Sequence, residues 1–113
     1  MPLYVVTHAE LSSGYQVAQT AHALAEFALR RPREFSHWEN GYIVCLQTSN
    51  ALSLEQLFHD SVEQGFDVIA FREPDLSHQI TAIAYAPAPS VRSHLSRLSL
   101  AGKSTSTQQR SKQ

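Results

Sequence analysis

The sequence predicts an α/β fold in three layers, α/β/α, in which helices cover both faces of a four-stranded mixed sheet. Short apolar runs alternate with longer segments of 3.6-residue spacing, and the resulting order of elements is β-α-β-α-β-β-α. Long helical crossovers join the first three strands, which favours parallel strands with right-handed connections. The short link at 73–78 precedes the fourth strand and permits antiparallel or more distant pairing.

The N-terminal strand and the helix after it follow from the residue pattern. Residues 2–8 form the first strand, and the almost continuous apolar run Leu3–Val6 is typical of a strand buried on both faces. Ser13 and Gln16 have the spacing of a capping box, so we expect the helix to begin there. The helix ends at the residue before Pro32, because proline removes a backbone donor and clashes with the preceding turn.

Similar signals bound the remaining elements. Residues 33–40 are predicted to be a polar loop, and Ser53 with Gln56 forms a second capping box. Gly65 closes the helix that this box begins. The other expected elements are strands at 41–48, 67–72 and 79–86, and a short last helix at 91–98.

Length and composition predict one domain with a tail. A chain of 113 residues supports one core, which we place in residues 1–101. Residues 102–113 contain no apolar side chain and are expected to be a disordered, polar, basic tail. Three of the nine basic residues lie in this tail, so the domain carries six basic and ten acidic residues. A surplus of about four negative charges weighs against strong non-specific RNA binding by the domain.

The sequence also predicts the compartment and the absence of a metal. No apolar stretch approaches the ~20 residues of a membrane helix, and the N-terminus lacks secretory-signal features, so we expect a cytoplasmic protein without a membrane partner. The lone Cys45 is interpreted as a small buried hydrophobic residue. No cofactor is expected, and no metal either, since the histidines lack metal-ligand spacing. These histidines are His8, His22, His37, His59, His78 and His94.

The first helix carries the candidate chemistry. Apolar side chains occupy well over half of its circumference, with Val17, Ala21, Leu24 and Ala28 in one stripe. Two interpretations of the remaining polar strip stay open. It is either the solvent face of an amphipathic helix or a site near the helix N-terminus, where α/β proteins bind ligands. The strip consists of Tyr15, Gln19, His22, Glu26 and, at its edge, Arg30.

The sequence of this region resembles a known family. Residues 10–23, E-L-S-S-G-Y-Q-V-A-Q-T-A-H-A, resemble the signature D-L-x-x-G-[KQ]-x-A-A-Q-x-x-H-A of class 2 (archaeal and eukaryotic-type) peptidyl-tRNA hydrolases. The resemblance continues in E-P-D-L at 73–76 and T-A-I-A-Y-A-P at 81–87. These segments are similar to the family's aspartate-bearing loop and the strand after it. The strand and helix order expected over residues 3–100 also agrees with that fold.

The resemblance implies an activity. Family members hydrolyse the ester that joins a peptide to the 3′ ribose of tRNA, without a metal, so tRNA or peptidyl-tRNA is the implied partner. By this resemblance Asp75 would orient or deprotonate a water, and Thr81 and Gln19 would hold the water or donate to the carbonyl. The implied catalytic residues are Gln19, His22, Asp75 and Thr81, and the implied substrate-binding residues are Gly14 and Tyr15. The compact basic group Arg30-Arg31-Pro32-Arg33 is either an RNA-backbone contact or a solvated helix end.

Two departures from the family pattern leave a second function open. Tyr15 stands where the family usually has lysine, and Glu10 stands for the aspartate of the opening D-L. Tyrosine donates a hydrogen bond but carries no charge at neutral pH. The alternative is a non-catalytic binding or regulatory module on the same fold, which would form a homodimer or a partner complex through the alanine-rich helix or a sheet edge.

Overall fold

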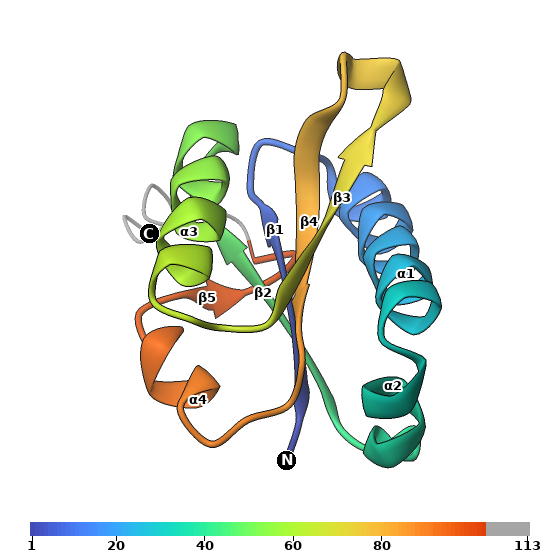
Figure 1. Cartoon of the computed structure of the whole chain (residues 1–113). Coiled ribbons are helices and arrows are strands. Elements are labelled where there is room, and N and C mark those ends of the chain that lie inside the picture. Colours follow the sequence, from blue (N-terminus) through green and yellow to red (C-terminus); the bar gives the residue numbers. More distant parts are fainter. Residues whose placement is uncertain (104–113) are drawn as a thin grey trace.

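Helices pack on both sides of a five-stranded sheet in the computed structural model, which describes residues 1–103 (Figure 1). Each helical layer contributes to its own hydrophobic core. The elements are β1 (Leu3–His8), α1 (Ser13–Arg30), α2 (Pro32–Trp38), β2 (Ile43–Thr48), α3 (Ala51–Glu63), β3 (Val68–Glu73), the 3-10 turn η1 (Pro74–Leu76), β4 (Gln79–Tyr85), α4 (Val91–His94) and β5 (Ser99–Leu100).

The strands lie in the order β3-β4-β1-β2-β5. β1 and β2 are parallel, and β4 is antiparallel to both β1 and β3, so the predicted mixed sheet is confirmed. β1, β2 and β3 run in one direction, but β4 separates β3 from the other two. The prediction of four strands is wrong, because β5 adds a short antiparallel edge to β2 through Leu46 and Leu100. Two residues are too few to leave a strand pattern in the sequence.

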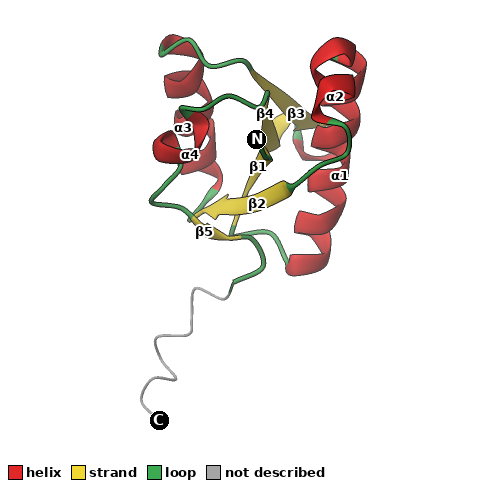
Figure 2. Ribbon diagram, turned by 90° about the horizontal axis from the view of Figure 1, so that it is seen from below, coloured by secondary structure: helices red, strands yellow, loops and turns green. Residues whose placement is uncertain are grey.

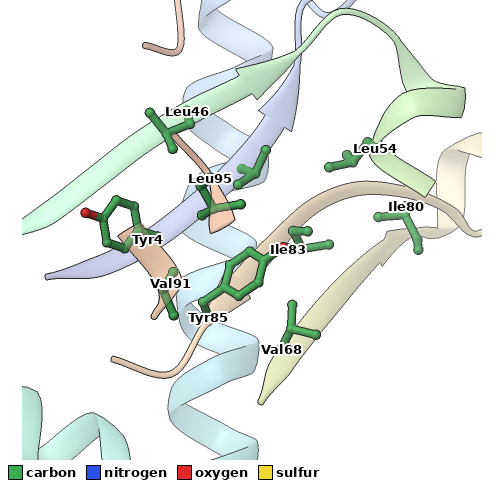
Figure 3. Close-up of a cluster of buried hydrophobic side chains, with 10 residues drawn as sticks. Tyr4, Leu46, Leu54, Val68, Ile80, Ile83, Tyr85, Val91 and Leu95 are labelled. Atoms are coloured by element: carbon green, nitrogen blue, oxygen red, sulfur yellow. The ribbon is translucent and has the colours of Figure 1, made fainter. Parts of the chain in front are cut away.

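Helices cover both faces of the sheet, as expected. Figure 2 shows α1 and α2 on one side and α3 and α4 on the other. Side chains along β1 and β4 alternate between the two cores because successive residues of a strand point to opposite faces. The core beneath α3 and α4 is drawn in Figure 3 and includes Tyr4, Leu46, Leu54, Val68, Ile80, Ile83, Tyr85, Val91 and Leu95.

The helix starts differ from the prediction. Ser12, not Ser13, is the N-cap of α1, and its hydroxyl accepts a hydrogen bond from the backbone N–H of Tyr15. In α3 the cap is Asn50, whose side chain forms a capping box with Ser53 at the third helical position. Both errors have the same cause. Several adjacent polar residues precede each helix, any of them can serve as the N-cap, and their spacing in the sequence does not show which one does.

Residues 33–40 were predicted to be a loop, but most of them belong to α2. Pro32 occupies the first turn of α2, where its missing N–H costs nothing, so it both stops α1 and begins the next helix. Phe35 and Trp38 lie three residues apart and pack against the core under α1, with Phe35 6.3 Å from Phe27 between ring centroids. The last helix is also shorter than predicted, because α4 ends at His94.

The described chain ends against α1 and β2. The backbone N–H of Gly102 donates to Oε1 of Gln16 at 2.9 Å, and Nε2 of Gln47 donates to the carbonyl of Lys103 at 2.9 Å. These bonds hold Gly102 and Lys103, the first two residues of the predicted tail, in place, and residues 104–113 lie outside the described residues. Within residues 1–103, the helices all fall short of the length and apolarity needed to span a membrane.

Candidate functional site

α1 buries two glutamine side chains, Gln16 and Gln19, against the sheet beside the apolar Ala23 and Phe27, and leaves other apolar side chains facing solvent. Gln19 is 1% exposed, whereas Val17 is 71% and Leu29 79% exposed. The solvent-face interpretation of the polar strip is therefore wrong for Gln19. The buried amide of Gln19 needs hydrogen-bond partners on the sheet, because a buried amide without a partner costs about 1–3 kcal/mol.

A β-bulge in β4 supplies the first partner. Phe71 of β3 pairs with Ala82, but the next residue, Arg72, pairs with Ile80, so Thr81 is an extra residue in β4. A bulge changes the direction of a side chain at that position. Thr81 points to α1, and its hydroxyl donates to Oε1 of Gln19 at 2.6 Å.

Glu73, the last residue of β3, supplies the second partner. Nε2 of Gln19 donates to Oε1 of Glu73 at 2.9 Å, and the backbone N–H of Asp75 contacts the other carboxylate oxygen at 3.3 Å. The carboxylate fixes the Gln19 amide, since a flipped amide would place its oxygen against negative charge. The hydroxyl of Thr7 also donates to the carbonyl of Thr81 at 2.8 Å. Thr81, Gln19 and Glu73 thus form one hydrogen-bonded series.

Glu73 is a site residue that the motifs of the sequence do not indicate. The resemblance directed attention to Asp75, two residues later, which is exposed and lies in η1. Its backbone N–H, rather than its carboxylate, makes the contact with Glu73. A usable signal was present, because Glu73 ends an apolar strand, and the carboxyl ends of β1, β2 and β3 share one edge of the sheet (Figure 1).

Three other predicted residues lie on α1 within about one and a half turns of Gln19. His22 is exposed and stacks on Phe71, with ring centroids 4.6 Å apart and planes 9° apart. Gly14 and Tyr15 lie in the first turn of α1, and the Tyr15 side chain is partly exposed. The solvent-accessible groups of the site are therefore the rings of Tyr15 and His22, the backbone of the first turn of α1 and a small part of Glu73. Glu73 is 9% exposed, and Thr81 is fully buried.

Arg30 and Arg31 are far from this site. They end α1, about 24 Å along the helix axis from Gly14 at 1.5 Å per residue. Arg31 forms a bidentate pair with Asp67, its Nε 3.0 Å from both carboxylate oxygens, and this hydrogen bonding raises the pKa of Arg31. Nη1 of Arg30 lies 3.6 Å from Glu26. The structure therefore does not bring the two predicted substrate-binding arginines to the predicted catalytic residues.

No group of three histidine, cysteine, aspartate or glutamate side chains arranged for a metal occurs in residues 1–103. Cys45 is half-buried, and desolvation raises the pKa of its thiol, as expected for a small hydrophobic residue rather than a nucleophile.

Comparison with known proteins defines the class of fold. No protein-family model and no curated protein matches the amino-acid sequence. Among solved structures, the chain is similar to Atu0240, a protein of unknown function from Agrobacterium tumefaciens strain C58. The TM-score is 0.62 at 15% sequence identity, over 88% of this chain and 96% of that one. The similarity shows a shared mixed α/β fold.

Proposed function

We propose that this protein is a hydrolase of a carboxylic ester of the peptidyl-tRNA type, in which Glu73 activates the attacking water. The observation that carries the proposal is the hydrogen-bonded series from Thr81 through Gln19 to Glu73, at the carboxyl end of the strands. A partly accessible carboxylate fixed by a buried amide is suited to act as a general base. The helix motif that resembles the class 2 family supplies the substrate class.

Each residue of the site has a distinct part in this mechanism. Glu73 takes a proton from water, and the water oxygen attacks the ester carbonyl carbon. The negative charge that develops on the carbonyl oxygen is stabilised by the free N–H groups at the start of α1. As the ester bond breaks, protonated Glu73 returns this proton to the departing ribose oxygen, which leaves the carboxylate ionised again. Gln19 and Thr81 are too buried to touch substrate and act as positioning residues.

The rim of the site would contact the substrate. Tyr15 offers a neutral phenolic donor in place of the lysine typical of the family, and His22 presents a ring held against Phe71. Asp75 lies on the exposed turn whose backbone is bound to Glu73. This arrangement assigns water activation to Glu73 and leaves Asp75 as a peripheral group.

Two isosteric variants test this assignment. Purified protein is incubated with N-acetylated aminoacyl-tRNA, and release of the acylated amino acid is measured for wild type, Glu73→Gln and Asp75→Asn. We expect Glu73→Gln to slow release at least about 100-fold, the lower bound for loss of a general base, and Asp75→Asn to change it less than about threefold. A wild type no faster than Glu73→Gln refutes the hydrolase. The reverse ranking of the two variants transfers the role of base to Asp75.

The outer face of α1 favours a second function, a binding module that pairs with a second copy of the chain. Val17, Ala18, Ala21, Ala25 and Leu29 form an exposed, uncharged surface along the helix. Small residues at four-residue spacing permit close helix packing. This surface is about 18 Å long and about 10 Å wide, or about 180 Å². Stable dimers bury about 800 Å² per partner, so α1 alone supports only a weak dimer.

A neighbouring groove extends this surface. It has a volume of about 260 Å³ and is lined by Val17 and Thr20 of α1, by Cys45 of β2 and by Ala101. Sedimentation equilibrium between 1 and 500 μM measures the dimer, because this range covers association free energies of about −8 to −4.5 kcal/mol. Val17→Asp is expected to abolish it, and the matched control Leu52→Asp, on the exposed side of α3, is not. A wild type that stays monomeric while it hydrolyses ester refutes the binding module.

A further inference from the structure

β3 forms one edge of the sheet and has unpaired backbone groups. It pairs with β4 alone in the strand order. The backbone N–H of Ala86 donates to the carbonyl of Asp67, its opposite residue, so this pair is a hydrogen-bonded one. Such pairs alternate along an antiparallel ladder, which makes Ile69 and Phe71 the next residues bonded to β4. The N–H and C=O groups of Val68 and Ala70 therefore point away from the sheet.

These groups face a groove that runs along the edge. The groove has a volume of about 390 Å³, within the usual range for ligand sites. Side chains from both helical layers line it, with Glu26 and Arg30 from α1 and Phe58 from α3, beside residues 68–72 of β3 itself. The last residue of β3 that lines the groove is Arg72, which directly precedes Glu73, the proposed base.

We propose that this groove binds the C-terminal segment of a peptide in extended conformation, as an added strand. The inference rests on the proposed function and specifies how its substrate is held. The ester-bonded end of the peptide must reach Glu73 at the carboxyl end of β3, so the added strand runs parallel to β3. From Val68 to Glu73 the strand is about 17 Å long at 3.3 Å per residue, the length of about five peptide residues.

Backbone pairing is the mode of recognition suited to this substrate class. Main-chain hydrogen bonds supply affinity without reference to side chains, so one edge accepts peptides of many sequences. Val68 and Ala70 each offer one N–H and one C=O, which provides four such bonds. A lone peptide strand brings no helices to this edge, whereas a second copy would bring its own α1 and α3 against those that flank the groove.

Amide hydrogen exchange on the full chain tests the proposal. The probe is the pentapeptide alanine-threonine-valine-threonine-alanine, acetylated at its N-terminus and amidated at its C-terminus, which resists hydrolysis. At saturation we expect the amides of Val68 and Ala70 to exchange at least about tenfold more slowly, and those of Ile69 and Phe71, already bonded to β4, to change little. Alternate protection of this kind distinguishes an added strand from general stabilisation of β3.

Two variants measure the contribution of one backbone donor. Ala70→Pro removes an N–H that does not bond to β4, and the edge position tolerates proline. Loss of one hydrogen bond of about 1 kcal/mol is expected to raise the peptide Kd about fivefold. Ala70→Ser keeps the N–H and is expected to bind as wild type does. If Ala70→Pro fails to fold, the alternating exchange pattern in wild type decides.

Three results would overturn the inference: protection that does not alternate, peptide-induced changes confined to the outer face of α1, or protection of Val68 and Ala70 that rises with protein concentration alone. The last would assign the edge to a second copy. The test is separate from catalysis, because the probe is not an ester. Alternate protection in a protein that releases nothing from aminoacyl-tRNA refutes the hydrolase alone, and Glu73-dependent release without that protection refutes the added strand alone.

Discussion

Replacement of Ser61 by alanine removes a hydroxyl that joins α3, β4 and α4. Ser61 Oγ lies 2.7 Å from the carbonyl of Leu57, 2.6 Å from the hydroxyl of Tyr85 and 2.8 Å from Nε2 of His94. A hydroxyl has one donor and two acceptor positions. When Ser61 donates to Leu57, the Tyr85 hydroxyl and the His94 Nε2–H both donate to Ser61. Ser61 and Tyr85 have no solvent exposure.

The expected loss of stability follows from these contacts. In Ser61→Ala the buried Tyr85 hydroxyl loses its partner, which costs about 1–3 kcal/mol. Its phenol cannot escape the cost by ionising, since burial raises the pKa of Tyr85 to about 12. His94 is partly exposed and can bind water instead. Alanine is a better helix former than serine by about 0.5 kcal/mol. The net decrease in the free energy of unfolding is therefore about 0.5–2.5 kcal/mol.

Urea denaturation of four proteins measures this quantity: wild type, Ser61→Ala, Tyr85→Phe and the double variant. Tyr85→Phe leaves Ser61 its bonds to Leu57 and His94, so it should cost less than Ser61→Ala. The double variant has no orphaned phenol, and we expect its destabilisation to be about 1 kcal/mol smaller than the sum of the single ones. Additivity within about 0.3 kcal/mol would falsify the account of the Tyr85 hydroxyl.

Three further predictions concern other parts of the molecule. Burial lowers the pKa of His8, so near and below pH 6.5 the unfolded chain binds more protons than the folded protein does. The free energy of unfolding should therefore fall as the pH is lowered from 7.5 to 5.5, and His8→Gln should remove part of that fall. Arg31→Ala breaks a half-exposed ion pair with Asp67 and should cost at most about 1 kcal/mol, with ester release unchanged; a tenfold loss of release would place Arg31 in substrate binding. Gly65→Ala forces a side chain to a φ of 91° and should lower Tm by about 4–8 °C in a thermal scan, whereas an unchanged Tm contradicts this account of the turn.

The fold was predictable where burial imposes a pattern over several residues. The first strand is buried along its whole length, and Gly65, with its positive φ, ends α3 close to where the pattern indicated. α2 was not predictable from Pro32 alone, because proline at this position stops one helix and begins another. β5 was not predictable either, because Ser99 and Leu100 form a strand by pairing with Gln47 and Leu46 and do not show a strand pattern of their own.

The site was predictable in composition and less so in geometry. Spacing placed Gln19 on a polar strip, but only the bulge at Thr81 and the carboxylate of Glu73 explain why Gln19 faces inward while the rest of the strip is exposed or half-buried. A bulge shifts register by one residue and leaves no signature of its own in a single sequence. The choice between Glu73 and Asp75 likewise depends on the residue at which β3 ends, which sequence patterns locate only within a few residues.

The strand order has a consequence for how the molecule is made. β4 fills the gap between β3 and β1, yet it comes after about two thirds of the chain. A nascent chain that has emerged only through β3 can pair β1 with β2, but the strand that must join them to β3 does not yet exist. Synthesis from the N-terminus therefore leaves the middle of the sheet until late, and the β3 edge stays without its neighbour during that time. We expect acquisition of protease resistance to require emergence of residues beyond Tyr85 from the ribosome.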